Sequence, residues 1–178
     1  NFMFLIYLII ATIPSIIVGF LIKPLIEETF NNIYFVGIGF LLTSLIILYN
    51  PKKTKTNKYN LKNTLITGLF QSFALLPGIS RSGTTMFGSK IAKLDSKKGK
   101  KFTFFLLFPI SIGSTILSIL DINFINGNMI ILYLIAFISA FIFSFISLKL
   151  FINKFNNKHN IFFSIYLWFV SFCIFTFL

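Results

Sequence analysis

The residues best suited to chemistry are gathered in one short stretch of an otherwise apolar chain. Residues 76–85 read Leu-Pro-Gly-Ile-Ser-Arg-Ser-Gly-Thr-Thr, which places Arg81 among four hydroxyl side chains and two glycines. An arginine guanidinium can bind a phosphate through two parallel hydrogen bonds, and glycine lets a backbone come close to a ligand. Hydroxyl groups and free backbone N–H groups can complete an anion cradle. The stretch therefore predicts recognition of a phosphate group.

These residues also have purely structural interpretations. An arginine at membrane depth usually faces a cavity or a partner, and a carboxylate could be that partner. The acidic residues of the chain are Glu27, Glu28, Asp95 and Asp121, and all of them fall in predicted loops. Because no apolar run supplies a carboxylate, anion binding is favoured for Arg81. Serine and threonine hydroxyls can instead cap helices or bond to the backbone, and Gln71 can bond across helices.

The composition is that of an integral membrane protein. Hydrophobic residues make up 56% of the chain and charged residues 11%, with a mean hydropathy of +0.90, whereas soluble domains carry about 25% charged residues. The net charge of +12 comes mostly from lysines between apolar runs, which favours anionic lipid headgroups over nucleic acid. A single Cys173 excludes an intramolecular disulfide and a cysteine-based metal site. His159 lies in a predicted polar loop and is interpreted as an interfacial residue.

Apolar runs predict spans at about residues 1–22, 33–49, 102–120, 129–151 and 161–178. The positive-inside rule places the lysine-rich loops at 50–63, 97–101 and 153–160 on the cytoplasmic side. The loops containing Glu27, Glu28 and Asp121 then lie outside. Residues 64–94 must begin and end on the cytoplasmic side, yet two crossings need about 40 residues. This segment is therefore predicted to enter the membrane and return as a re-entrant hairpin.

The local sequence of the hairpin supports this prediction. A short helix is expected over 64–76, because Pro77 and Gly78 break it. Ser82 or Thr84 can cap a second helix over about 85–93. Irregular backbone at membrane depth is tolerated where it lines a cavity, so the tip is expected to line one. The predicted fold class is all-α: a polytopic membrane helix bundle with a re-entrant helical hairpin, in a single integral membrane domain over 1–178.

Two segments resemble a known family. Residues 71–85, Gln-Ser-Phe-Ala-Leu-Leu-Pro-Gly-Ile-Ser-Arg-Ser-Gly-Thr-Thr, closely resemble the second signature of the undecaprenyl-pyrophosphate phosphatase family, the bacitracin-resistance proteins. Residues 102–109, Phe-Thr-Phe-Phe-Leu-Leu-Phe-Pro, followed by Gly113, resemble the Phe-Ser-Phe-Leu-Leu-x-x-Pro segment of that family. The order and the spacing match as well. The resemblance covers essentially the whole chain, as the C-terminal two-thirds of a typical member.

The resemblance implies hydrolysis of undecaprenyl diphosphate to undecaprenyl phosphate and inorganic phosphate, which recycles the carrier lipid of cell-wall synthesis. It implies half of an inverted-repeat fold in the bacterial plasma membrane, with the active site facing the extracytoplasmic side. The partner is the polyprenyl diphosphate lipid, with no nucleic acid, and a homodimer is left open. The implied catalytic residues are Arg81, Ser80 and Ser82, and the implied substrate-binding residues are Gly78, Gly83, Thr84, Thr85 and Gln71.

The chain also departs from the family pattern. The first signature, a Glu-x-x-x-Glu pair followed by Pro-x-Ser-Ser-x-Gly-His, is absent, and Glu27 and Glu28 are adjacent. In the family that segment supplies the ligands of a divalent cation, Mg²⁺ or Ca²⁺. We therefore expect this chain to be incomplete and inactive alone. The alternatives are a transporter or flippase of an anionic polyprenyl-phosphate lipid, which would bind without hydrolysis, and a decayed remnant. Paired glutamates ahead of Asn1 would favour the hydrolase.

Overall fold

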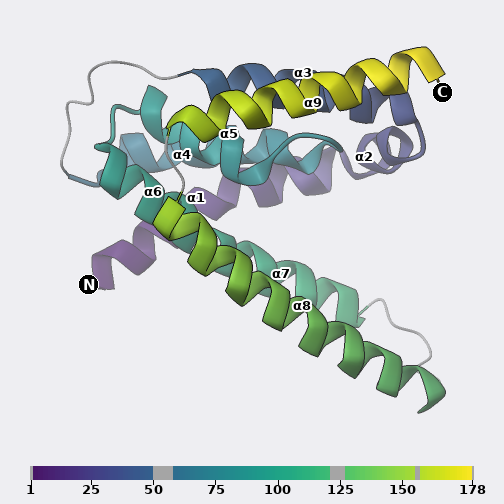
Figure 1. Ribbon diagram of the computed structural model, residues 1–178. Helices are drawn as coiled ribbons and strands as arrows, with labels where there is room; N and C mark the ends of the chain where they lie inside the picture. Colours follow the sequence, from purple (N-terminus) through teal and green to yellow (C-terminus); the bar gives the residue numbers. More distant parts are fainter. Residues whose placement is uncertain (1, 50–57, 121–126, 155–156, 178) are drawn as a thin grey trace. The chain divides into compact units, whose positions relative to one another are not determined.

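The computed structural model describes residues 2–49, 58–120, 127–154 and 157–177. Within these ranges the secondary structure is helical and contains no strand, which confirms the all-α fold class. The chain divides into two compact units, one of residues 1–111 with 160–178 and the other of residues 112–159. Figure 1 shows the course of the helices. The predicted site lies in the first unit.

The described residues form a succession of helices along the chain. They are α1 (Phe2–Leu21), α2 (Lys23–Phe30), α3 (Ile33–Leu48), α4 (Leu61–Ser72), the 3₁₀ turn η1 (Phe73–Leu75), α5 (Arg81–Ile91), α6 (Ser96–Phe105), α7 (Leu107–Leu120), α8 (Gly127–Lys154) and α9 (Asn157–Phe177).

The centre of the first unit is the crossing of α1 with α4. Gly68 of α4 lies directly against the backbone of Ala11, so a side chain at position 68 would collide with α1. Leu8, Ala11, Phe102 and Leu106 are buried together beside this crossing, and they form the apolar core that joins α1 to the segment after the hairpin. The hairpin is therefore backed by α1 and held in place by close helix packing.

Helix α9 runs along α3, as Figure 1 shows. The buried hydroxyl of Ser164 donates to the backbone oxygen of Ser44 at 2.9 Å. The buried hydroxyl of Ser171 donates to the oxygen of Gly37 at 2.8 Å. Each bond joins helices that lie far apart in sequence, as small and hydroxyl residues commonly do between apolar helices. Helix α3 is thereby supported on its side away from the hairpin.

Some helices are long and apolar enough to cross a membrane. They are α1, the window Met129–Ser147 of α8 and the window Asn160–Phe177 of α9. Helices α2 and α3 meet at an angle of 99° and would add a fourth crossing if the pair forms one span. In the second unit, no residue of the window Met129–Ser147 is buried, which is the pattern of an apolar helix that faces lipid or another protein.

The predicted loop at 23–32 is wrong, because Lys23–Phe30 is helix α2. Its first turn contains Pro24, which is favoured at the start of a helix because its missing N–H would have no intrahelical acceptor there. Lys23 and Glu27 then form an exposed pair one turn apart, with 3.9 Å between Nζ and Oε1. The polar character of this segment is therefore that of a short surface helix.

The segment after the hairpin also differs from its prediction. The basic stretch 97–101 was expected as a loop and 102–120 as one span, but α6 contains the lysines and α7 starts at Leu107. Asp95 caps α6 by accepting from the N–H of Lys97 at 3.2 Å. Pro109 explains the break, because it lacks an N–H and its ring clashes with the carbonyl four residues earlier, that of Phe105.

Tyr59, which lies just before α4, bonds to α6. The Tyr59 hydroxyl donates to the backbone oxygen of Lys98 at 3.2 Å. Burial raises the pKa of the Tyr59 phenol, so the hydroxyl keeps its proton and remains a donor.

The predicted polar loop 153–160 is partly wrong, since α9 begins at Asn157 and includes His159 in its first turn. Which helices cross a membrane stays a prediction.

Candidate phosphate-binding site

The hairpin consists of α4, the turn η1, an irregular tip over residues 76–80, and α5. Helix α5 begins at Arg81, so the predicted start at about residue 85 is wrong. The predicted caps Ser82 and Thr84 are also wrong, because Ser80 caps the helix: its Oγ accepts from the N–H of Gly83 at 3.2 Å. Arg81 therefore occupies the first helical position, directly after the tip.

The tip is fastened to α3 by Thr43, a residue that the sequence did not single out. The Thr43 hydroxyl accepts from the N–H of Ser80 and donates to the oxygen of Gly78, each at 3.0 Å. Gly39, one turn earlier on α3, lies against the backbone of Pro77 and Gly78 and has no room for a Cβ. Gly78 itself has a φ of 78°, a conformation that glycine adopts without strain. The signal for this contact in the sequence is Gly39, since the neighbouring Gly37 packs against Phe175 of α9 instead.

The guanidinium of Arg81 has no partner within the described ranges of the chain. It is half-buried, and it makes neither an ion pair nor a hydrogen bond with the residues described there. The first turn of α5 carries no acidic residue. An unpaired guanidinium that is partly removed from water is costly unless an anion joins it. Arg81 is thus available to a ligand.

The predicted hydroxyl residues fall into two groups. Ser80 and Ser82 lie on either side of Arg81, with 3.4 Å between their Oγ atoms, and Ser82 is exposed. Thr84 and Thr85 are buried, and both hydroxyls donate to the backbone oxygen of Arg81, at 3.1 and 2.7 Å. The serines therefore flank Arg81 in the sequence with their hydroxyls close to each other, whereas the threonines bond to the first turn of α5.

Gln71 and Gly83 lie near the tip but make contacts of their own. Gln71 is buried, and its Nε2 donates to the hydroxyl of Ser15 on α1 at 3.4 Å. This contact is the bond across helices that the sequence offered as the alternative to a substrate contact. Gly83 packs against the Ser80 side chain, with 3.2 Å between the Cβ it would carry and Ser80 Oγ. Roles for both residues in substrate binding stay predictions.

The residues described do not fit a divalent-cation site. Mg²⁺ and Ca²⁺ prefer several carboxylate or carbonyl oxygens around one point. Within the described part of the chain no three His, Cys, Asp or Glu residues gather closely enough to hold a metal. Glu27 pairs with Lys23, and Asp95 caps α6. The donors needed by a cation are therefore not supplied at the arginine tip by these residues.

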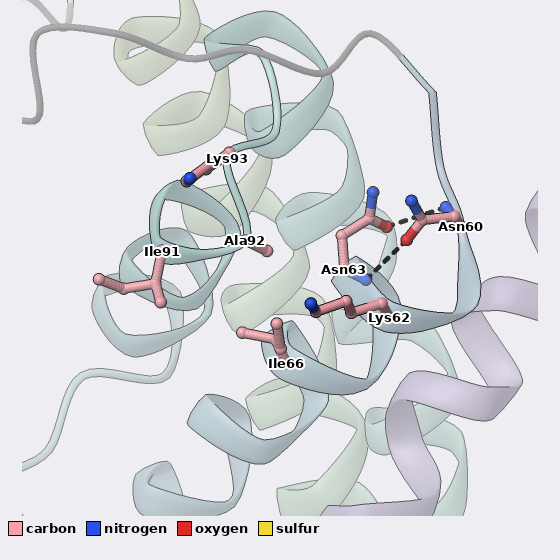
Figure 2. Close-up of a pocket in the computed structure, with 7 residues that line it drawn as sticks. All are labelled: Asn60, Lys62, Asn63, Ile66, Ile91, Ala92 and Lys93. Carbon is pink, nitrogen blue, oxygen red and sulfur yellow. Dashed lines mark hydrogen bonds between the residues drawn. The ribbon is translucent and has the colours of Figure 1, made fainter.

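A hollow of about 310 Å³ lies at the open end of the hairpin, where α4 begins and α5 ends. Figure 2 shows its lining, which is Asn60, Lys62, Asn63, Ile66, Ile91, Ala92 and Lys93. Asn60 and Asn63 close a reciprocal capping box there, at 2.8 and 3.0 Å. This hollow lies at the opposite ends of both helices from Arg81, so it is distinct from the arginine tip.

Fold and site together define an all-α, multi-pass membrane protein that presents, at the start of a short helix, an arginine whose guanidinium is unpaired among the described residues. A model of the bacitracin resistance protein BacA family matches residues 1–173. The chain therefore belongs to that family, and the resemblance of its two signature segments is confirmed.

Named relatives agree with this membership. An undecaprenyl-diphosphatase 2 from Bacillus thuringiensis (strain Al Hakam) is 39% identical over 125 residues, which is 68% of this chain and 46% of the relative. An undecaprenyl-diphosphatase from Thermosipho africanus is 40% identical over 113 residues, 62% of this chain and 46% of the relative. One from Methanococcus maripaludis (strain C7) is 34% identical over 122 residues, 66% and 49%. The match spans about half the length of these relatives.

Proposed function

We propose that this chain is the diphosphate-binding part of an undecaprenyl-diphosphate phosphatase. The observation that carries the proposal is the half-buried guanidinium of Arg81, which none of the described residues pairs and which lies in the signature stretch of a chain belonging to the BacA family. The reaction releases inorganic phosphate and leaves undecaprenyl phosphate for reuse in cell-wall synthesis. The substrate is a lipid, so a site built into a membrane helix bundle suits it.

Arg81 and the start of α5 would bind the diphosphate group. The N–H groups of Arg81 and Ser82 have no intrahelical acceptor, because the carbonyls four residues earlier precede the helix. They add to the positive end of the helix dipole. When water attacks the terminal phosphorus and the anhydride bond breaks, charge builds on the bridging oxygen, and donors already in place stabilise it. Ser80 and Ser82 would orient the phosphate oxygens.

A divalent cation belongs to the proposal but not to these residues. Mg²⁺ or Ca²⁺ would neutralise part of the diphosphate charge, as metal ions do in phosphoryl transfer. Its ligands would have to come from residues other than the described acidic side chains. We further propose that the site faces the extracytoplasmic side of the bacterial plasma membrane. A homodimer would be compatible with the exposed apolar helix α8.

The test is binding of farnesyl diphosphate, a short soluble prenyl diphosphate, to the purified chain in lipid nanodiscs. Because a hydrogen bond to a charged group contributes strongly, Arg81→Ala should weaken binding about tenfold or more. Lys23→Ala, which removes an exposed charge on α2, is the matched control and should change affinity by less than about twofold. Equal affinities for Arg81→Ala and the unmodified chain would refute the proposal.

Hydrolysis is tested separately. The chain alone should release no phosphate from undecaprenyl diphosphate, whereas the chain reconstituted with the N-terminal half of the Bacillus thuringiensis relative should release it. Transport is measured with the chain reconstituted into sealed proteoliposomes. Movement of the lipid from one leaflet to the other without phosphate release would support the transporter alternative and contradict the phosphatase.

A further inference from the structure

We propose that Thr43 is a positioning residue, which holds the arginine tip in the geometry that binds the diphosphate. The inference rests on the proposed function, since it assigns the residue that aims Arg81. It concerns a side chain on α3 that lies outside both signature segments. Its basis is a pair of hydrogen bonds that joins one hydroxyl of α3 to the backbone of the tip.

One hydroxyl makes both bonds. Thr43 Oγ1 accepts from the N–H of Ser80, 37 residues away, and donates its proton to the oxygen of Gly78, 35 residues away, both at 3.0 Å. A hydroxyl has one proton, so donation to Gly78 fixes its orientation and leaves a lone pair for the Ser80 N–H. Thr43 is 2% exposed. Water therefore cannot readily replace either bond.

These bonds decide where α5 begins. Ser80 is the cap of α5, and Arg81 follows it directly. Holding the Ser80 N–H against α3 sets the direction in which the backbone enters the helix, and this direction sets where the Arg81 side chain leaves it. The close approach of Gly39 to Pro77 brings the tip within reach of the hydroxyl. The tip is thus attached to α3, a helix that does not belong to the hairpin.

Two substitutions separate the hydroxyl from the volume of the side chain. Thr43→Val keeps the shape and removes the hydroxyl, which leaves the Ser80 N–H and the Gly78 oxygen buried without a partner. Thr43→Ser keeps the hydroxyl and loses one methyl group. If the bonds position Arg81, the serine variant retains what the valine variant loses.

The first measurement is the affinity of each variant for farnesyl diphosphate in nanodiscs. We expect Thr43→Val to lose about fivefold or more and Thr43→Ser to stay within about twofold of the unmodified chain. Ser171→Ala is the matched control, because Ser171 is also buried and also donates to a backbone oxygen of the α3 region, that of Gly37. An equal loss in Ser171→Ala would mean a general effect on packing and would overturn the inference.

The second measurement is a double-mutant cycle with Arg81→Ala. If Thr43 acts through Arg81, Thr43→Val should cost less than about twofold once Arg81 is gone. Losses that multiply would overturn the inference while leaving the proposed function intact. An Arg81→Ala variant that binds normally would instead refute the proposed function.

The third measurement uses the unmodified chain and needs no variant. In the unmodified chain the Ser80 amide should exchange its hydrogen more slowly than the Ser82 amide, because only Ser80 donates to Thr43. Equal exchange at the two positions would overturn the inference.

Discussion

At the residue scale, Arg81 stands where a cation is unfavourable. The start of a helix carries a partial positive charge, so a side chain of the same sign at the first position costs about 0.3–1 kcal/mol. Helix α5 has no acidic residue in its first turn to offset this. A bound diphosphate would interact favourably with both the guanidinium and the helix end. The unfavourable placement is thus explained by a ligand, as functional sites often retain such local costs.

Ser80 combines two roles that substitution can separate. Its Oγ caps α5 through the Gly83 N–H, and as the residue before Arg81 it is also proposed to bind a phosphate oxygen. Ser80→Ala removes the cap and should lower stability by about 1 kcal/mol. Ser80→Asn restores a cap of similar quality, so it should regain stability in thermal unfolding. If the hydroxyl also contacts the diphosphate, the asparagine variant will still bind farnesyl diphosphate more weakly. Full recovery of binding in Ser80→Asn would restrict Ser80 to capping.

At the element scale, α3 supports the site because one of its faces contacts the tip and the other contacts α9. Gly39 and Thr43 are four residues apart and share one face, which contacts the tip. Gly37 and Ser44 accept hydrogen bonds from α9 through their backbone oxygens. The tip is therefore positioned by a helix that is itself held from behind.

Gly39→Ala tests this support directly. The new Cβ would collide with the backbone of Pro77 and Gly78, which cannot rotate away as a side chain could. Forced overpacking typically costs about 1–3 kcal/mol, so we expect a lower thermal midpoint together with weaker farnesyl diphosphate binding. Gly19→Ala is the control, because its Cβ would only touch Leu75 Cδ1 at an ordinary 3.6 Å. A Gly39→Ala variant as stable as the control would show that the tip is not held closely to α3.

Local signals predicted the elements better than their boundaries. Composition predicts an all-α membrane protein, and Pro77 with Gly78 predicts the break in the hairpin. The start of α5 was missed because several hydroxyl residues in succession could each serve as its cap. The choice of Ser80 depends on Thr43, which lies 37 residues away in the sequence and cannot be paired with the tip by local reasoning. Pro109, by contrast, is a local signal for the break between α6 and α7, but the prediction of one span over 102–120 gave it too little weight.

At the scale of the whole molecule, the distribution of charge governs how the chain can sit in a membrane. Lys58 and Lys62 lie at the start of the hairpin and the lysines of α6 follow its end, whereas Glu27 and Glu28 lie on α2. Cytoplasmic loops carry an excess of Lys and Arg. Both ends of the hairpin are therefore predicted to lie on the cytoplasmic side. This prediction separates a re-entrant hairpin from one that crosses the membrane once.

Single cysteines can decide the orientation. In a Cys173→Ser background, Lys58→Cys and Ser96→Cys mark the two ends of the hairpin, and Asn31→Cys marks the acidic side; all three positions are exposed. A maleimide that cannot cross membranes should label positions 58 and 96 only in inside-out vesicles, and position 31 only in intact cells. Detergent-opened membranes should label all three, which controls for reactivity. Labelling of positions 58 and 96 from opposite sides would mean that the hairpin crosses the membrane once, because its length of about 30 residues is far too short for three crossings. The arginine tip would then lie along a continuous span, and its proposed access from the extracytoplasmic side would lose its structural basis.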